Sequence, residues 1–248
     1  MHKYKAILFD LFDTIINFNF RQLPTVEMNG IRSRTTSKEV YSVFERYYPE
    51  ISFSGFYPYF IESYHQFQEM KLAEYREFPN RNRFILMLQN MKLTPNEKTD
   101  RLADEMVVAH MDGLAQCIEF PEENKRTLEK VKEKGYLTAI VSNFDYAPTA
   151  HALIDKYDIG RFFEQIVISE EVGWRKPKDI IFRRALMLLN IEPEDALFVG
   201  DNFSADVRGA KAVGIKTVWL NKNRASLQAE PPPDYTIEGL PQLNEILA

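Results

Sequence analysis

Residues 6–14 read AILFDLFDT, an apolar run that ends in an aspartate. Consecutive apolar residues before Asp10 are typical of a parallel strand that is buried on both faces. Similar runs follow at residues 137–141, 165–168, 196–199 and 216–220. Between them lie amphipathic segments with apolar residues three and four apart, at 122–134, 147–157 and 178–189. This alternation predicts a doubly wound parallel α/β sheet.

The stretch from residue 17 to residue 119 differs, because it lacks β-type runs and carries aromatic and charged residues at helical spacing. We predict helices there at residues 40–48, 56–77, 81–91 and 99–114. The stretch is therefore interpreted as a helical domain inserted after the first strand. Residues 1–16 and 120–248 then form a Rossmann-like core, which ends in a short strand and helix after the prolines at 231–233.

The composition excludes several classes of protein. With 248 residues, 45% of them hydrophobic, the chain can bury a core and a smaller lid, so it is not disordered as a whole. Its net charge of −5 and the lack of a long basic run argue against nucleic acid as a partner. No apolar stretch approaches the roughly 18 residues of a membrane span, and no signal-peptide pattern is present. We expect a cytoplasmic protein without a membrane partner.

Polar residues follow four of the predicted strands. Asp10 follows the first, Ser142 and Asn143 the second, and Lys176 lies in the loop after the third, while Asp201 follows the fourth. In open α/β sheets, ligands bind beyond the carboxyl ends of the strands. The order of these residues predicts one site that they share.

Each residue type suits a task in phosphate chemistry. Asp10 can attack an electrophile and form a covalent intermediate. Asp10, Asp201 and Asp206 offer the oxygen ligands that a hard cation such as Mg²⁺ prefers. Lys176 and Ser142 can bind phosphoryl oxygens as charge develops. Taken alone, Asp206 could also cap or begin a helix predicted at residues 207–213.

The chain resembles the haloacid dehalogenase (HAD) superfamily in four segments that occur in the family's order. They are FDLFDT (9–14), VSN (141–143), GWRKP (173–177) and VGDNFSAD (199–206). These segments span nearly the whole chain, and the insertion after the first is similar to the family's C1-type helical cap. The resemblance implies a HAD-like hydrolase, and we expect a phosphatase of a small phosphorylated metabolite.

The resemblance also implies roles for individual residues. Asp10 is the nucleophile that forms an aspartyl-phosphate, and Thr14 and Ser142 support the phosphoryl site, with Asn143 beside them in the catalytic set. Lys176 neutralises charge. The expected cofactor is Mg²⁺. The resemblance implies that its ligands are Asp10, the backbone carbonyl of Phe12, Asp201 and Asp206.

Phe12 departs from the pattern of HAD phosphatases, which have an aspartate there as general acid. Such acid–base help is typically worth about 10²–10⁴-fold in rate. Asp13 lies one residue further on, where an extended chain turns its side chain to the opposite side, unless a turn redirects it. HAD dehalogenases also carry an aromatic residue at this position, but the acidic fourth segment favours a metal-dependent phosphatase.

Three alternatives remain open from the sequence. The first is a 2-haloacid dehalogenase-type hydrolase. The second is a phosphatase whose acid comes from the insertion, where His65, Lys71 and Arg76 are candidates, or whose substrate has a good leaving group. The third is a non-catalytic phosphate-binding relative.

Overall fold

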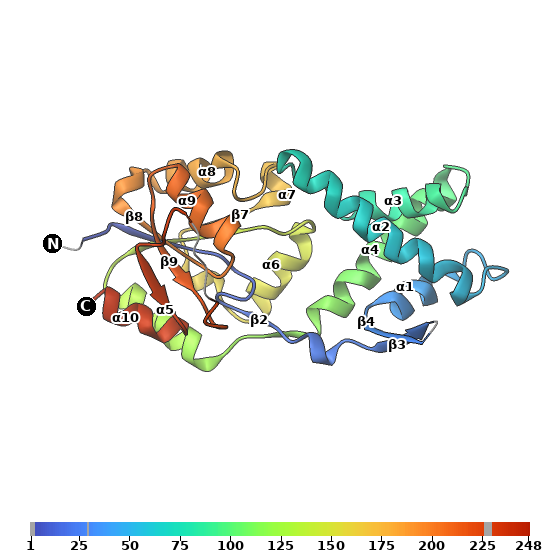
Figure 1. The fold of residues 1–248 in the computed structure, drawn as a ribbon, viewed down its shortest axis with the longest axis horizontal. Helices are drawn as coiled ribbons and strands as arrows, with labels where there is room; N and C mark the ends of the chain where they lie inside the picture. Colours follow the sequence, from blue (N-terminus) through green and yellow to red (C-terminus); the bar gives the residue numbers. More distant parts are fainter. Residues whose placement is uncertain (1–2, 29, 226–229) are drawn as a thin grey trace. The chain divides into compact units, whose positions relative to one another are not determined.

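The computed structural model of the protein describes residues 3–28, 30–225 and 230–248 (Figure 1). The chain divides into two compact units, one formed by Met1–Phe18 with Glu119–Ala248 and the other by Asn19–Ile118. We call them the core unit and the inserted unit and describe each by itself. Within the described ranges, no helix is both long and apolar enough to cross a membrane.

The core unit is built on a six-stranded parallel sheet. Its strands are β1 (Ala6–Phe9), β6 (Leu137–Ser142), β7 (Gln165–Ile168), β8 (Ala196–Gly200), β9 (Lys216–Leu220) and β10 (Tyr235–Ile237). They lie in the order β10-β9-β8-β1-β6-β7, so the winding reverses direction at the central strand β1. The prediction of a doubly wound α/β sheet is confirmed.

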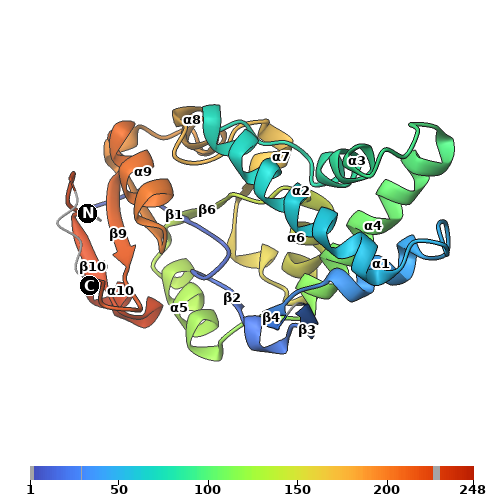
Figure 2. The ribbon, with the colours of Figure 1, turned by 45° about the vertical axis from the view of Figure 1, so that its right-hand side comes forward.

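Helices cover both faces of this sheet. They are α5 (Glu122–Glu133), α6 (Ala147–Lys156), α7 (Ser169–Val172), α8 (Asp179–Leu189), α9 (Gly209–Ala212) and α10 (Leu243–Ile246). Figures 1 and 2 show α8 and α9 on one face, and α5 and α10 on the opposite face. Shorter helical turns lie at Gly160–Phe162, Pro193–Asp195 and Leu240–Gln242, and a π-helix at Phe203–Arg208.

The apolar periodicity of the sequence explains how these elements pack. Ala6 and Leu8 are fully buried in one cluster with Phe182 and Leu186 of α8. Since side chains alternate along a strand, the remaining residues of β1 face the other layer, and both sides must be apolar. Each fully buried side chain of this size contributes about 1.5–3 kcal/mol. Burial on both faces therefore holds the end of β1, and with it Asp10, in a rigid frame.

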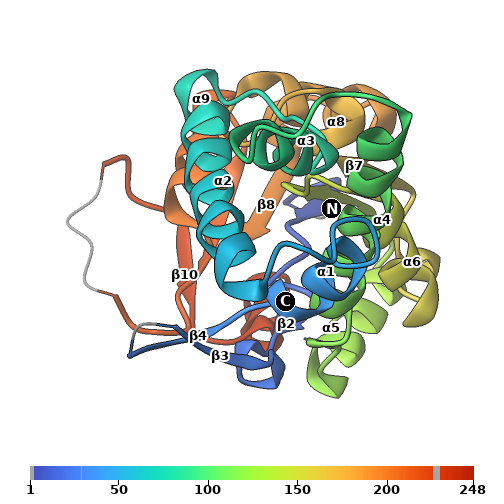
Figure 3. The ribbon, with the colours of Figure 1, turned by 90° about the vertical axis from the view of Figure 1, so that its right-hand side faces the viewer.

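In the described residues of the inserted unit, 19–28 and 30–118, there are four α-helices and one strand pair (Figure 3). Its elements are the turn Phe20–Gln22, strands β3 (Thr25–Met28) and β4 (Ile31–Arg34), and helices α1 (Ser37–Phe44), α2 (Phe53–Glu74), α3 (Arg81–Asn90) and α4 (Glu97–Ala115). Short strands β2 (Asn17–Phe18) and β5 (Ile118–Glu119) flank it along the chain. All four predicted helices are present.

The interpretation of the insertion as a helical domain is incomplete, because β3 and β4 pair antiparallel in it. The sequence signal is weak because only Val26 of this pair is deeply buried, and Ile31 is 68% exposed. Gly30, with φ of +76°, adopts a backbone conformation that favours glycine. The pair is thus held by its backbone ladder and one buried side chain rather than by an apolar run.

Candidate active site

Three neighbouring strands bring the predicted acidic and hydroxyl residues to one edge of the sheet. Asp10 follows β1, Ser142 ends β6, and Asp201 follows β8, and these strands are adjacent in the order β8-β1-β6. The backbone N–H of Asp10 donates to the carbonyl oxygen of Val199 at 2.9 Å, so β1 and β8 remain paired up to this residue. The edge lies where the winding reverses, which is where open α/β sheets bind ligands.

Lys176 forms a buried ion pair with two of the carboxylates. Its Nζ lies 2.7 Å from Oδ1 of Asp10 and 2.7 Å from Oδ1 of Asp206. The lysine is 2% exposed and Asp206 1%. Burial alone would lower the pKa of Lys176, but the charges of Asp10 and Asp206 outweigh it and raise the pKa above its ordinary value. Lys176 is therefore a fixed positive charge beside the proposed nucleophile.

Asn143 holds the backbone of this lysine through two hydrogen bonds. The N–H of Lys176 donates to Oδ1 of Asn143 at 2.7 Å, and Nδ2 of Asn143 donates to the carbonyl oxygen of Lys176 at 3.0 Å. The two residues are far apart in sequence, so this pairing ties the loop after β7 to the end of β6. Asn143 therefore positions Lys176 through hydrogen bonds to its backbone N–H and carbonyl groups.

Thr14 and Ser142 carry the two hydroxyl groups predicted for the site. Oγ1 of Thr14 donates to Oδ2 of Asp10 at 3.2 Å, and Thr14 is fully buried. Oγ of Ser142 is also buried and has no hydrogen-bond partner in the described part of the chain. Because buried polar groups are normally paired, this hydroxyl is available for a ligand oxygen.

Asp10, Asp201 and Asp206 form a cluster whose ligand oxygens lie within 4.8 Å of one another. The backbone N–H of Asn202 donates to Oδ2 of Asp206 at 2.9 Å and orients that carboxylate. A Cβ atom on Gly200 would overlap with the carboxyl group of Asp206, so a residue without a side chain is required at the end of β8. The cluster offers hard oxygen ligands of the kind that Mg²⁺ takes.

The reading of Asp206 as a helix cap is wrong. Asp206 lies inside the π-helix Phe203–Arg208, and the side chain of Asn202 caps that helix by accepting from the N–H of Ala205 at 2.9 Å. The carboxylate of Asp206 does not cap a helix and instead pairs with Lys176 within the acidic cluster.

Burial and mutual repulsion raise the pKa of two of these carboxyl groups. The pKa of Asp201 rises to about 7, first through burial and then through the charges of Asp10 and Asp206. The pKa of Asp206 rises to about 6, mainly through burial, although the neighbouring Lys176 opposes the rise. Three carboxylates lie beside one lysine, which pairs with two of them, so the site has an excess of negative charge that a divalent cation would neutralise.

These raised pKa values predict how stability depends on pH. Both carboxyl groups bind a proton more tightly in the folded chain than at their unfolded pKa of 3.8, so this contribution to stability is lost as pH rises from about 4 to about 7. A divalent cation needs the deprotonated groups. We expect the rise in Tm caused by Mg²⁺ to be larger at about pH 8 than at about pH 5.5. Thermal unfolding at both pH values, with Mg²⁺ and with EDTA, measures it; an equal rise at both would contradict the expectation.

Phe12 points its ring to an aromatic partner beside the site. It stacks on Phe144 with ring centroids 4.5 Å apart and an interplanar angle of 26°. Phe144 directly follows the segment at residues 141–143, and this pairing was not predicted. The only sequence signal for this stacking is that both residues are aromatic and that each is close in sequence to a predicted site residue. The residue at the position where HAD phosphatases have their general acid therefore makes an apolar contact.

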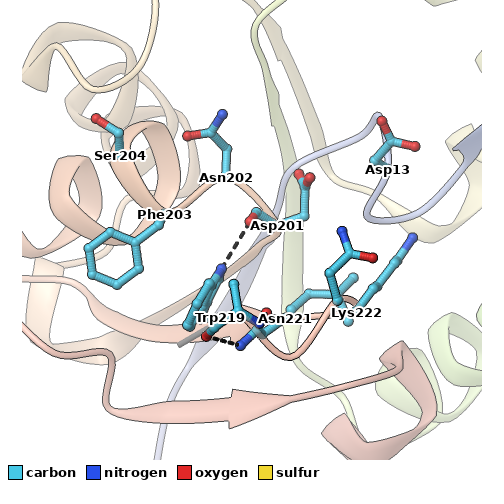
Figure 4. A pocket seen from close by; sticks show the side chains of 11 residues that line it. Asp13, Asp201, Asn202, Phe203, Ser204, Trp219, Asn221 and Lys222 are labelled. Carbon is cyan, nitrogen blue, oxygen red and sulfur yellow. Dashed lines mark hydrogen bonds between the residues drawn. The ribbon is translucent and has the colours of Figure 1, made fainter. Parts of the chain in front are cut away.

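Asp13 lies in a turn, with φ of +58°. Its Oδ1 accepts a hydrogen bond from the N–H of Phe18 at 3.0 Å. The turn redirects the side chain, so that Asp13 and Asp201 line the same pocket of about 500 Å³ (Figure 4). Trp219 lines it too, and its Nε1 donates to the carbonyl oxygen of Asp201 at 2.9 Å. The sequence left open whether a turn would rescue Asp13, and the structure brings it to the pocket.

Two of the three candidates from the insertion, Lys71 and His65, contact residues of their own unit. Nζ of Lys71 lies 3.1 Å from Oε1 of Glu77, and both side chains are almost fully buried. The ring of His65 meets that of Tyr64 edge-on at 5.5 Å. The positive charge of Lys71 is thus paired with Glu77 inside the inserted unit.

Comparison with known proteins shows the family of the chain. The haloacid dehalogenase-like hydrolase family matches residues 4–214. A glyceraldehyde 3-phosphate phosphatase of Pyrococcus furiosus is 30% identical over 251 residues, which cover 100% of this chain and 94% of that protein. A solved HAD phosphatase of Thermococcus onnurineus has 22% identity and a TM-score of 0.64, with 98% of each chain covered.

A 2-haloacid dehalogenase of Pseudomonas syringae has a similar fold, with 21% identity, a TM-score of 0.65 and 98% of each chain covered. The fold is thus shared by phosphatases and dehalogenases and does not separate them. The match over most of the chain and the full-length relative carry the family assignment. This chain belongs to the haloacid dehalogenase-like hydrolases.

Proposed function

We propose that this enzyme is a Mg²⁺-dependent phosphatase of a small phosphorylated metabolite, acting through an aspartyl-phosphate on Asp10. The observation that carries the proposal is the buried group of Asp10, Lys176, Asp201 and Asp206, which combines a nucleophile, a fixed cation and an acidic cation site. The names of curated relatives point the same way: a glyceraldehyde 3-phosphate phosphatase, a phosphoserine phosphatase and a ribulose-1,5-bisphosphate 5-phosphatase.

The residues present fit a Mg²⁺ ion. Three carboxylates converge while one lysine is shared between two of them, and only oxygen ligands are offered. By the family resemblance, the carbonyl oxygen of Phe12 would join Asp10, Asp201 and Asp206. When bound, Mg²⁺ would reduce the repulsion between an anionic phosphoryl group and the carboxylates.

The residues of the chain account for the two halves of the reaction. A carboxylate oxygen of Asp10 forms a bond to phosphorus while the bond to the leaving-group oxygen breaks. Lys176 and the unpaired hydroxyl of Ser142 would bind phosphoryl oxygens as charge develops on them. Water then attacks phosphorus and the bond to Asp10 breaks, which restores the carboxylate. One proton of this water leaves with the phosphate, and the other is released to solvent, from which the leaving-group anion of the first half takes a proton. Thr14 holds Asp10 in place through its hydrogen bond.

Phe12 bears on the choice between phosphatase and dehalogenase chemistry. An aromatic ring at this position cannot protonate a leaving group, which suits a halide or a good phosphate leaving group. The acidic cluster and the phosphatase names of the curated relatives favour the phosphatase. The resemblance further implies that the inserted unit is a C1-type cap. We propose that the inserted unit is a C1-type cap. We also propose that the protein is cytoplasmic.

Hydrolysis of p-nitrophenyl phosphate tests the proposal, because nitrophenolate leaves without a proton and a missing acid cannot mask a competent site. We expect phosphate release with Mg²⁺ and none with EDTA. L-2-chloropropionate is assayed beside it for halide release. Metal-independent halide release would replace the proposal with the dehalogenase, and no turnover of either compound would favour the non-catalytic relative.

A further inference from the structure

A fourth carboxylate lies next to the acidic cluster. Asp13 and Asp201 enter the 500 Å³ pocket from different segments, the turn after β1 and the end of β8 (Figure 4). Asp201 is thus common to the pocket and to the cluster with Asp10 and Asp206. Repulsion from Asp13 also contributes to the raised pKa of Asp201, so the two charges interact. Asp201 therefore connects the pocket with the cluster.

The backbone sets the direction of Asp13. A φ of +58° is uncommon for a residue other than glycine, and aspartate and asparagine tolerate it best. The hydrogen bond from the N–H of Phe18 to Oδ1 fixes the carboxyl group in this turn. Asp13 is therefore held at the pocket by a hydrogen bond within the core unit.

The pocket has room for the water of a hydrated cation. At about 30 Å³ per water molecule, 500 Å³ exceeds the volume of the several waters that Mg²⁺ usually retains in proteins. Among the described lining residues, Lys222 carries the positive charge, and its Nζ donates to Oδ1 of Asn17 at 2.7 Å. Asn202 and Ser204 add polar groups to the same wall.

We propose that Asp13 is an outer carboxylate of the Mg²⁺ site, which accepts hydrogen bonds from metal-bound water in this pocket. The inference rests on the proposed function, since it assigns an additional residue to the same site. Residues that bind a metal through another ligand commonly change metal affinity by about 10–100-fold when they are replaced. Asp13 thus strengthens Mg²⁺ binding without contacting the ion. It does not replace the general acid that HAD phosphatases have at the position of Phe12.

Asp13→Asn tests this role with little structural change. The amide keeps an oxygen for the N–H of Phe18, and asparagine accepts a positive φ. Isothermal titration with MgCl₂ at about pH 8, where Asp201 is largely deprotonated, should show a Kd about 10-fold or more above that of the native chain. The matched control is Asp155→Asn, which removes the same charge from an exposed position at the end of α6 and should leave the Kd unchanged.

The possible results separate the inference from the proposed function. An unchanged Kd in Asp13→Asn, or an equal loss in the control, would overturn the inference while leaving a native chain that binds Mg²⁺ and hydrolyses p-nitrophenyl phosphate. A native chain that binds no Mg²⁺ would overturn both. If Asp13→Asn unfolds with EDTA at a lower temperature than the native chain, Asp13→Gly, which suits the positive φ, must show the same loss of affinity.

Discussion

Replacing Asp10 with asparagine is expected to abolish phosphatase turnover, with a loss in kcat of at least about 10³-fold. An amide nitrogen or oxygen cannot take the place of the carboxylate as a nucleophile that later releases phosphate. The fold should persist, because the amide oxygen can still accept from Nζ of Lys176, and the amide nitrogen can donate to Oγ1 of Thr14 in place of the bond that Thr14 donates to Asp10. Initial rates with p-nitrophenyl phosphate and Mg²⁺ measure the loss.

A covalent readout separates this role from a merely structural one. Acid quenching during turnover should trap a phosphorylated native chain, detectable by mass spectrometry, and none of it in Asp10→Asn. Asp155→Asn, an exposed aspartate changed in the same way, serves as the control and should keep native rates. Hydrolysis by Asp10→Asn within about tenfold of the native rate would rule out Asp10 as the nucleophile.

Lys176→Met is expected to lower kcat by about 10²–10³-fold, the usual cost of one donor that stabilises developing charge. Methionine keeps the length of the side chain and removes its charge. The change also leaves Asp10 and Asp206 buried without their shared cation, and breaking a buried ion pair in this way costs about 3–5 kcal/mol. Rates with p-nitrophenyl phosphate and thermal unfolding in EDTA measure the two effects.

Mg²⁺ should restore part of the stability of Lys176→Met, because the ion neutralises the carboxylates that the lysine leaves. The rise in Tm on adding Mg²⁺ is therefore expected to be larger in this variant than in the native chain. Lys178→Met is the matched control: it lies in the same loop, and its Nζ lies over the ring of Trp174 at 5.2 Å. A Lys176→Met variant with native rates would show that the lysine does not bind the reacting group.

Much of the core could be predicted because its signals are local. Continuous apolar runs mark buried parallel strands, and the polar residue that ends each run lies at the same edge of the sheet. Asp10, Ser142 and Asp201 therefore follow from position alone. The hairpin of the inserted unit was missed for the converse reason. It buries little beyond Val26, so its residues carry no apolar run to detect.

The contacts of the site depend on residues that are far apart in the chain. The ion pair of Lys176 with Asp10 joins residues 166 positions apart, and no local pattern specifies it. Asn143 was predicted as a site residue, but its hold on the backbone of Lys176 became visible only in the folded chain. The same is true of Phe12, whose stacking on Phe144 shows where the ring goes.

Hydrophobic periodicity and the residues at the strand ends, which reflect local propensity and burial, were enough to predict the α/β class, the doubly wound sheet and the meeting of Asp10, Ser142 and Asp201 at one edge. The family resemblance implied the roles of Thr14 and of the Phe12 carbonyl. Tertiary structure alone decided how the charges of the site are shared. Packing places one buried lysine between two carboxylates, and a positive φ turns Asp13 toward the pocket of Asp201. The physical reason is that a side chain's direction and a pKa depend on distance in space and on loss of water, and neither is encoded in the spacing of residues along the chain.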